Sequence, residues 1–358
     1  MTWLAWRQYR WQGAFALFAL IVFAVLFGVT APHIWHTYNT VVKPCSRHGD
    51  CNSVDHAFLT NYNFYEHLIQ ASVIFPALLG AFWGGPLVAR EFENGTFRLT
   101  WTQSETRMKW LSSKLIVVGL GSVLTVGLFS LMATWWSHPY DIVNNAPFST
   151  FDVRDIAPLG YAAFAFALGV ALGTLVRRTL PAMATTLIAF AGVRVFFNLK
   201  IRPHFMSPLH ATSQFLPFSQ ANNVGVLSEK GAWIISSTTE TSAGKVIGQN
   251  GGIGSNGQIS FTNPVDGHPT FVGVGRCPNV FPKQSLQPTN SVHRVVVGRP
   301  SQAMQKAINE CVNSFHLKSV LTYQPADRFW TFQWYELASY LVLAGLLCVL
   351  SLWLVRRH

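Results

Sequence analysis

The chain has 358 residues, of which 50% are hydrophobic and only 11% are charged. Soluble domains carry about 25% charged residues, so this composition excludes an ordinary soluble protein and indicates a membrane protein. The formal net charge of +11 does not predict a nucleic-acid partner, because the basic residues form no stripe with interleaved aromatic residues.

Six stretches are apolar over the roughly 20 residues needed to cross a hydrocarbon core of about 30 Å. Only the fifth holds a charged residue, Arg194, near its end, where the long side chain is expected to snorkel to the interface. The predicted spans are residues 13–31, 68–89, 115–136, 157–176, 180–198 and 337–355.

Lysine and arginine residues in the short loops predict the orientation of these spans. Eleven lie on one side: Arg7, Arg10, Arg90, Arg98, Arg107, Lys109, Lys114, Arg177, Arg178, Arg356 and Arg357. The loops on the other side, residues 32–67 and 137–156, hold only Lys43, Arg47 and Arg154. Because cytoplasmic loops carry the excess of positive charge, we expect a multi-pass protein of the cell membrane with both chain ends in the cytoplasm.

Residues 1–12 precede the first span and mix aromatic with basic side chains, namely Trp3, Trp6, Arg7 and Arg10. This composition predicts an amphipathic helix that lies in the lipid headgroup plane. An ordinary aromatic belt with positively charged flanks is the alternative interpretation. The span that follows is too long for a signal peptide and is expected to remain as an anchor.

Residues 90–114 form a polar turn between the second and third spans that is longer than a hairpin needs. Asn94-Gly95 is a tight-turn pair, and Thr102 with Glu105 has the spacing of a helix capping box. A rigid element of mixed charge at a membrane surface is suited to docking into a cleft of a partner protein. A solvated loop that only sets topology is the alternative.

Small residues in the second and fourth spans favour close helix packing. They are Gly80, Gly84, Gly85, Gly169 and Gly173, with Pro76 and Pro86 beside them. Phe75, Phe82 and Trp83 are candidates to line an apolar route for a substrate, and contact with lipid is the alternative. Glu66 and Glu336 lie at outer span boundaries and are expected to be solvated at the interface, and a contact between them across the bundle is the alternative.

Residues 200–329 have the composition of a soluble domain, rich in Gly, Ser, Thr and Asn with short apolar runs that predict strands and loops. Met304, Ile308, Cys311 and Val312 have helical spacing and predict a helix. By the span count, this segment lies outside the cytoplasm.

The predicted fold is therefore an all-α polytopic membrane domain of six transmembrane helices, with a mixed α+β extracytoplasmic domain between helices 5 and 6. The expected divisions are residues 1–12 for the interfacial helix, 13–199 for helices 1–5, 200–330 for the extracytoplasmic domain, and 331–358 for helix 6 and the cytoplasmic C-terminus.

Five cysteines are present, and four of them fall in outer segments where oxidation is allowed. The predicted disulfides join Cys45 to Cys51 and Cys277 to Cys311. Cys348, inside the last span, is expected to be a buried thiol. A metal site built from the first pair and its neighbouring histidines is the alternative, although its spacing matches no common zinc pattern.

Two apparent nucleotide-binding signals do not hold. Residues 252–257 match G-x-G-x-x-G in letters, but a strand pattern follows where that fingerprint requires a helix. Gly244-Lys245 lacks the upstream glycine and the Ser or Thr of a Walker A loop. We therefore expect no catalytic residue, metal site, ATP site or other cofactor on this chain.

Residues 90–115, "REFENGTFRLTWTQSETRMKWLSSKL", resemble the first cytoplasmic loop of actinobacterial type-two ATP-binding-cassette (ABC-2) exporter permeases. The N-terminal "TWLAWRQYR", "NLKIRPHFMSP" after the fifth span, and residues 320–336 before the sixth are similar to the same family. The resemblance covers nearly the whole chain apart from the Gly/Ser-rich middle of the outer domain.

This resemblance implies that the loop is a coupling helix that contacts a separate ATPase subunit. The family's contact residues map to Arg90, Glu91, Glu93, Gly95, Thr96 and Arg98. Reversing the charges of Glu91 and Glu93 is expected to uncouple transport without affecting folding. Residues 2–12 resemble the family's connecting helix, which touches the same subunit.

The resemblance also implies two permease copies, expected as a homodimer, and two ABC ATPase copies that bind ATP and Mg. The function implied is alternating-access export of a small hydrophobic or amphipathic compound. A non-transporting membrane sensor or structural protein with a ligand-binding outer domain is the alternative.

Overall fold

The computed structural model describes residues 2–45, 51–95, 107–215, 231–253, 258–262, 271–276 and 302–357. The chain divides into two compact units, each considered by itself below. The helical unit comprises Met1–Met206 and Asp327–His358, and the sheet unit comprises Ser207–Ala326. These limits lie close to the predicted division at residues 200 and 330.

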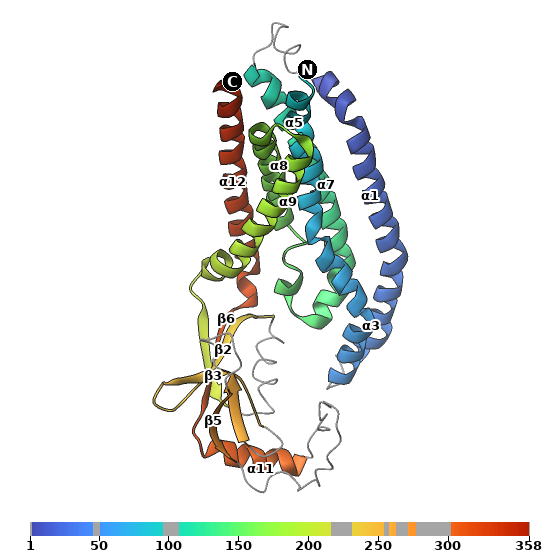
Figure 1. The fold of residues 1–358 in the computed structure, drawn as a ribbon. Helices are drawn as coiled ribbons and strands as arrows, with labels where there is room; N and C mark the ends of the chain where they lie inside the picture. The colour runs from blue at the N-terminus through green and yellow to red at the C-terminus, as the bar shows by residue number, and fades with distance from the viewer. Residues whose placement is uncertain are drawn as a thin grey trace, which may run out of the picture. The chain divides into compact units, whose positions relative to one another are not determined.

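In the described residues, six helical segments are long and apolar enough to cross a membrane. They are Arg10–Cys45, Glu66–Glu93, Met108–Asn144, Ala157–Val176, Thr179–His204 and Ala326–Arg357. Each contains one of the six predicted spans, so the prediction of a mostly helical membrane domain is confirmed. The two chain ends lie at the same end of the helical unit (Figure 1), as an even number of spans requires.

The first helix, α1, runs without a break over Thr2–Thr37. The helix does not end at the division expected after residue 12, and α1 continues through Gln12-Gly13. At about 1.5 Å per residue, the 36 residues of α1 span roughly 54 Å, well beyond a hydrocarbon core of about 30 Å. An interfacial position for residues 2–12 stays a prediction.

Two segments expected as outer loops are largely helical. After α1, the chain continues through η1 (Tyr38–Val42) and α2 (Lys43–Cys45), and α3 covers Asn52–Ala71. Similarly, α7 extends over Arg107–Asn144. These extensions form because aromatic side chains pack between them, with Phe58, Tyr62 and Trp136 all buried.

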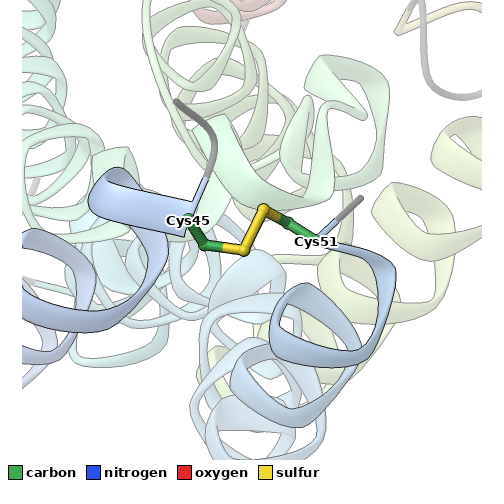
Figure 2. Close-up of a disulfide and its surroundings, with 2 residues drawn as sticks. All are labelled: Cys45 and Cys51. Atoms are coloured by element: carbon green, nitrogen blue, oxygen red, sulfur yellow. A yellow bond between two sulfur atoms is a disulfide. The ribbon is translucent and has the colours of Figure 1, made fainter. Parts of the chain in front are cut away.

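The structure joins α2 to α3 by the predicted Cys45–Cys51 disulfide, with an S–S distance of 2.08 Å (Figure 2). Cys311 lies in α11, but Cys277 lies outside the described residues, so the second pairing stays a prediction. Cys348 is a free thiol that is half-buried, where a buried one was expected.

The second span is assembled from η2 (Ser72–Ile74), α4 (Phe75–Leu79), the π-helical η3 (Gly80–Gly84) and α5 (Gly85–Glu93). It crosses α8 (Ala157–Val176) at the predicted small residues. A Cβ atom on Gly84 would lie 2.5 Å from the carbonyl oxygen of Phe166, and one on Gly173 would lie 2.5 Å from that of Gly85. The predicted close packing is confirmed, since real Cβ contacts are longer than this.

The most buried of the six spans is α8, which contacts α5, α7, α9 and α12. The segment that enters α8 contains η4 (Pro147–Thr150), and α9 (Thr179–Phe196) follows α8. The fifth span then continues through η5 (Phe197–Ile201) and η6 (Arg202–His204). The last span consists of η7 (Ala326–Arg328) and α12 (Phe329–Arg357).

Within the described residues of the sheet unit, six antiparallel strands pair in the order β1-β6-β2-β3-β4-β5. Their bounds are β1 Leu209–Gln214, β2 Trp233–Glu240, β3 Val246–Ile253, β4 Gln258–Thr262, β5 Phe271–Arg276 and β6 Lys318–Gln324. The predicted helix is α11, Gln302–Asn313, and its Ile308 and Val312 are buried. Strands, turns and this one helix agree with the mixed composition expected from the sequence.

Candidate functional site

The polar turn between the second and third spans is held at both ends by an ion pair. Glu91 of α5 pairs with Lys114 of α7, and their side chains are only 15% and 5% exposed. The Lys114 ammonium nitrogen also lies 4.5 Å from the centre of the Trp110 ring. The helices on either side of the turn are therefore joined by a nearly buried charge pair.

The last residue of α5 joins the turn to the fifth span as well. The Glu93 carboxylate accepts hydrogen bonds from the backbone N–H of Thr179, at 2.9 Å, and from its hydroxyl, at 2.6 Å. Thr179 is the first residue of α9, where the backbone N–H has no partner within the helix. Nearby, the Arg177 guanidinium lies 5.4 Å from the Phe92 ring.

These contacts correct one expectation about the coupling residues. Glu91 and Glu93 hold α5 to α7 and α9, so reversing their charges is expected to disturb folding rather than leave it intact. Arg90 is exposed, and Gly95 takes the positive φ of +70° that favours glycine in the turn. Thr96 and Arg98 lie outside the described residues.

The predicted connecting-helix residues Trp3, Trp6, Arg7 and Arg10 all lie in α1. Arg10 is exposed, and its guanidinium lies 5.6 Å from the exposed Trp11 ring. An exposed basic and aromatic pair suits the interface between lipid headgroups and water.

The three candidate path residues have different surroundings. Phe75 packs against Phe129 with ring centres 5.2 Å apart, whereas the Phe82 side chain is 52% exposed. Trp83 is buried and lines a groove between α1 and α7. The structure therefore does not bring these residues together in one surface.

A cluster of charged and tyrosine side chains lies buried between α8, α9, η6 and α12. Glu336 of α12, which is fully buried, accepts hydrogen bonds from Arg194 at 2.9 Å and from Arg202 at 2.7 Å on each of its oxygens. Tyr161 of α8 donates a further hydrogen bond to Glu336 at 2.8 Å. Both arginine residues are 7% exposed.

Asp152, in the segment before α8, completes this charge cluster at its edge, where its side chain is 28% exposed. It forms ion pairs with Arg202 and, at 3.0 Å, with Arg194. Two arginines therefore face two carboxylates, and the cluster is neutral. Burial alone would raise the pKa of Asp152, but the two guanidinium groups hold it below its usual value.

Two expectations about these residues are wrong. Arg194 does not snorkel, because its guanidinium lies 3.8 Å from the centre of the buried Tyr161 ring and pairs with carboxylates. Glu336 is not solvated at the interface either. Glu66, the other carboxylate predicted at a span boundary, accepts hydrogen bonds from Tyr140 and, at 3.0 Å, from Gln70.

Sequence reasoning missed this cluster because Asp152 and Arg202 fall in segments predicted as loops. The available signal was Arg194 in an otherwise uncharged span, since an ionisable residue inside a membrane requires a partner. The contacts of Arg194 and Arg202 with the two carboxylates, and of Tyr161 with Glu336, connect α8, the fifth span and α12 to the segment that contains Asp152.

Six candidate membrane helices, a glycine-lined crossing and a buried charge cluster define a polytopic membrane protein of the helical-bundle class. Residues 17–202 match the family model described as ABC-2 membrane transporter related. This match covers more than half of the 358 residues, and the chain belongs to that family. Searches of the curated proteins and of the solved structures find no match.

Membership makes the chain a transporter membrane component, in a family that associates with an ABC ATPase and has no ATPase site of its own. The matched range includes most of the first and fifth spans, the three spans between them, the polar turn and the glycine crossing. It does not include the sheet unit.

Proposed function

We propose that this chain is the permease subunit of an exporter. It moves a small hydrophobic or amphipathic compound out of the cell, in the manner of drug efflux, and ATP hydrolysis on a separate ATPase subunit drives the transport. The assembly contains two permease copies, expected as a homodimer, and two ATPase copies that hold the ATP and Mg. Both chain ends lie in the cytoplasm.

The observation that carries this proposal is how the polar turn is attached to the spans. Glu91 connects α5 to α7, and Glu93 connects α5 to the start of α9. A partner that moves the turn therefore acts on three spans through two short, direct contacts. Solvated loops that only set topology have no need of such attachments.

The crossing of the second span and α8 at their glycine residues supports the proposal that the spans rock against each other in alternating access. Backbone atoms of the second span and α8 touch at Gly80, Gly84, Gly169 and Gly173, with no side chain between them. Two surfaces without side chains offer few interlocking groups, so the crossing suits a pivot about which helices rock in alternating access. The buried charge cluster then keeps α8, α9 and α12 moving together.

The decisive experiment is co-purification of the full chain with a candidate ABC ATPase subunit. The test variant is Arg90→Glu with Arg98→Glu, because Arg90 is exposed and Glu91 and Glu93 serve folding. Reversed charges across a docked interface cost several kcal/mol, so the variant is expected to lose the ATPase and compound-stimulated ATP hydrolysis. Arg356→Glu, an exposed position on α12, is the matched control and is expected to keep both.

Normal insertion of both variants is checked by size-exclusion chromatography. Unchanged ATPase binding and stimulation in the Arg90 and Arg98 variant would show that the turn only sets topology. Failure of the wild-type chain to bind any ABC ATPase would contradict the transport proposal itself.

A further inference from the structure

A groove of about 520 Å³ runs between α1 and α7 in the helical unit, and Trp83 of η3 contributes to its lining. Most of its surface is apolar or small, as at Ala16, Leu20, Val118 and Gly121. The volume lies within the roughly 300–1,000 Å³ of pockets that bind small ligands. It has the surface chemistry of a site for a hydrocarbon chain.

One end of the groove is polar, with Arg10 and Gln12 among its lining residues. The Gln12 amide nitrogen donates a hydrogen bond to the carbonyl oxygen of Phe82 at 3.2 Å, which fixes the side chain. Its Oε1 atom is buried and has no hydrogen-bond donor among the described residues. Arg10 adds an exposed positive charge with several N–H donors.

The groove has the length of one bilayer leaflet. Its lining extends from Arg10 to Leu20 on α1, ten residues that rise about 15 Å in a helix. On α7 it extends from Val117 to Leu128, which rises about 16 Å. Half of a hydrocarbon core of about 30 Å is the same distance. A lipid of one leaflet thus matches the apolar length with its headgroup at Arg10.

We propose that this groove binds one anionic membrane phospholipid, with an acyl chain between α1 and α7. The lipid phosphate accepts hydrogen bonds from the exposed Arg10 guanidinium. Charge complementarity with Arg10 selects an anionic headgroup. This binding site does not depend on the transport proposal, because it needs neither an ATPase nor a substrate.

The test is native mass spectrometry of the purified full chain incubated with equal amounts of phosphatidylglycerol and phosphatidylcholine that carry the same acyl chains. Phosphatidylglycerol is anionic and has hydroxyl donors, whereas the phosphatidylcholine headgroup is zwitterionic and has none. We expect about a tenfold preference for phosphatidylglycerol, because its net negative charge is complementary to Arg10 and the phosphatidylcholine headgroup has no net charge. Arg10→Gln is expected to abolish that preference.

Two glycine variants distinguish lipid bound in this groove from lipid bound non-specifically elsewhere on the chain. Gly13 lines it, and Gly345 lines a second groove of about 490 Å³ between α7, α8 and α12 that has no charged lining residue. A Cβ atom built on either glycine meets no atom of a neighbouring element within 4 Å, so a side chain can start at both positions without a clash. Gly13→Leu is expected to remove the retained phosphatidylglycerol, and Gly345→Leu to keep it.

Equal retention of the two lipids by the wild-type chain would overturn the proposal, as would an undiminished preference in Arg10→Gln or equal lipid loss in the two glycine variants. The same spectra report the oligomeric state. A dimer that retains neither lipid would assign the groove to a second copy of the chain and likewise contradict lipid binding.

Discussion

Glu336→Gln tests whether the buried charge cluster holds the helical unit together. The carboxylate accepts hydrogen bonds from Arg194, Arg202 and Tyr161 at 2.7 to 2.9 Å and is fully buried. Glutamine keeps the shape but removes the charge, and its amide N–H groups point at positively charged donors. Two buried guanidinium groups are then left with Asp152 as their sole carboxylate in the cluster.

Removing one partner from a buried ion pair costs about 3–5 kcal/mol, because a buried charge is left without compensation. We expect the free energy of unfolding of Glu336→Gln to fall by that amount, measured by titrating the purified chain from mild detergent into SDS. Asp327→Asn is the matched control, an exposed carboxylate near the start of the same helix, and surface changes of this kind stay within about 0.5 kcal/mol.

The double variant Glu336→Gln with Arg194→Gln examines the cause of the loss. It restores neutrality, with Arg202 facing Asp152, and is expected to be more stable than the sum of the two single changes by about 1–3 kcal/mol. If Glu336→Gln unfolds at the same SDS fraction as Asp327→Asn, the cluster does not hold the spans together. Simple additivity in the double variant would show that shape, not charge, causes the loss.

Three further predictions follow from the fold. Gly84→Leu places side-chain atoms against the backbone of α8 and is expected to abolish the monodisperse peak of the purified chain in size-exclusion chromatography. The control is Gly192→Leu, which is expected to leave that peak unchanged because a Cβ atom on Gly192 meets no neighbouring element within 4 Å. The pKa of Asp152 is lowered in the folded chain, so the contribution of this carboxylate to stability is complete above the unfolded pKa of about 3.9 and is lost as the pH falls through the folded pKa. Below about pH 4, the SDS fraction at the unfolding midpoint of the wild type is therefore expected to drop, and that of Asp152→Asn is expected to change less. An equal drop in the wild type and in Asp152→Asn would show that other groups cause the acid sensitivity. Ser242 is an exposed residue in the β2–β3 turn. If the sheet unit is extracytoplasmic, Ser242→Cys is expected to react with a membrane-impermeant maleimide on intact cells. Labelling only after lysis would show that the sheet unit lies in the cytoplasm.

The sequence by itself determined the number and positions of the membrane helices. A bilayer requires about 20 apolar residues with internally bonded backbone, and this demand is local, so a scan of hydrophobicity finds each span. Local chemistry also determined the Cys45–Cys51 pairing, separated by six residues, and the amphipathic helix α11. The crossing at Gly84 and Gly173 was predictable for a similar reason, since small residues mark where helix backbones approach.

The ends of the helices could not be read in this way. Packing in a cluster that includes Ile34, Tyr62 and Tyr140 accompanies the extension of α1, α3 and α7 beyond the apolar stretches. The energy of that packing comes from side chains far apart in the chain, so no local pattern reports it. The continuation of α1 through residue 12 likewise depends on the absence of any signal that ends a helix.

Only the tertiary structure decided which charged residues are partners. Asp152, Arg194, Arg202 and Glu336 come from four separate segments, and each taken alone resembles an interfacial charge that water would solvate. Once α8, α9 and α12 pack, water is excluded and the carboxylates become the available partners for the guanidinium groups. For the same reason, Glu91 and Glu93 proved to be attachments between helices: their partners, Lys114 and Thr179, are distant in sequence and adjacent only in the folded chain.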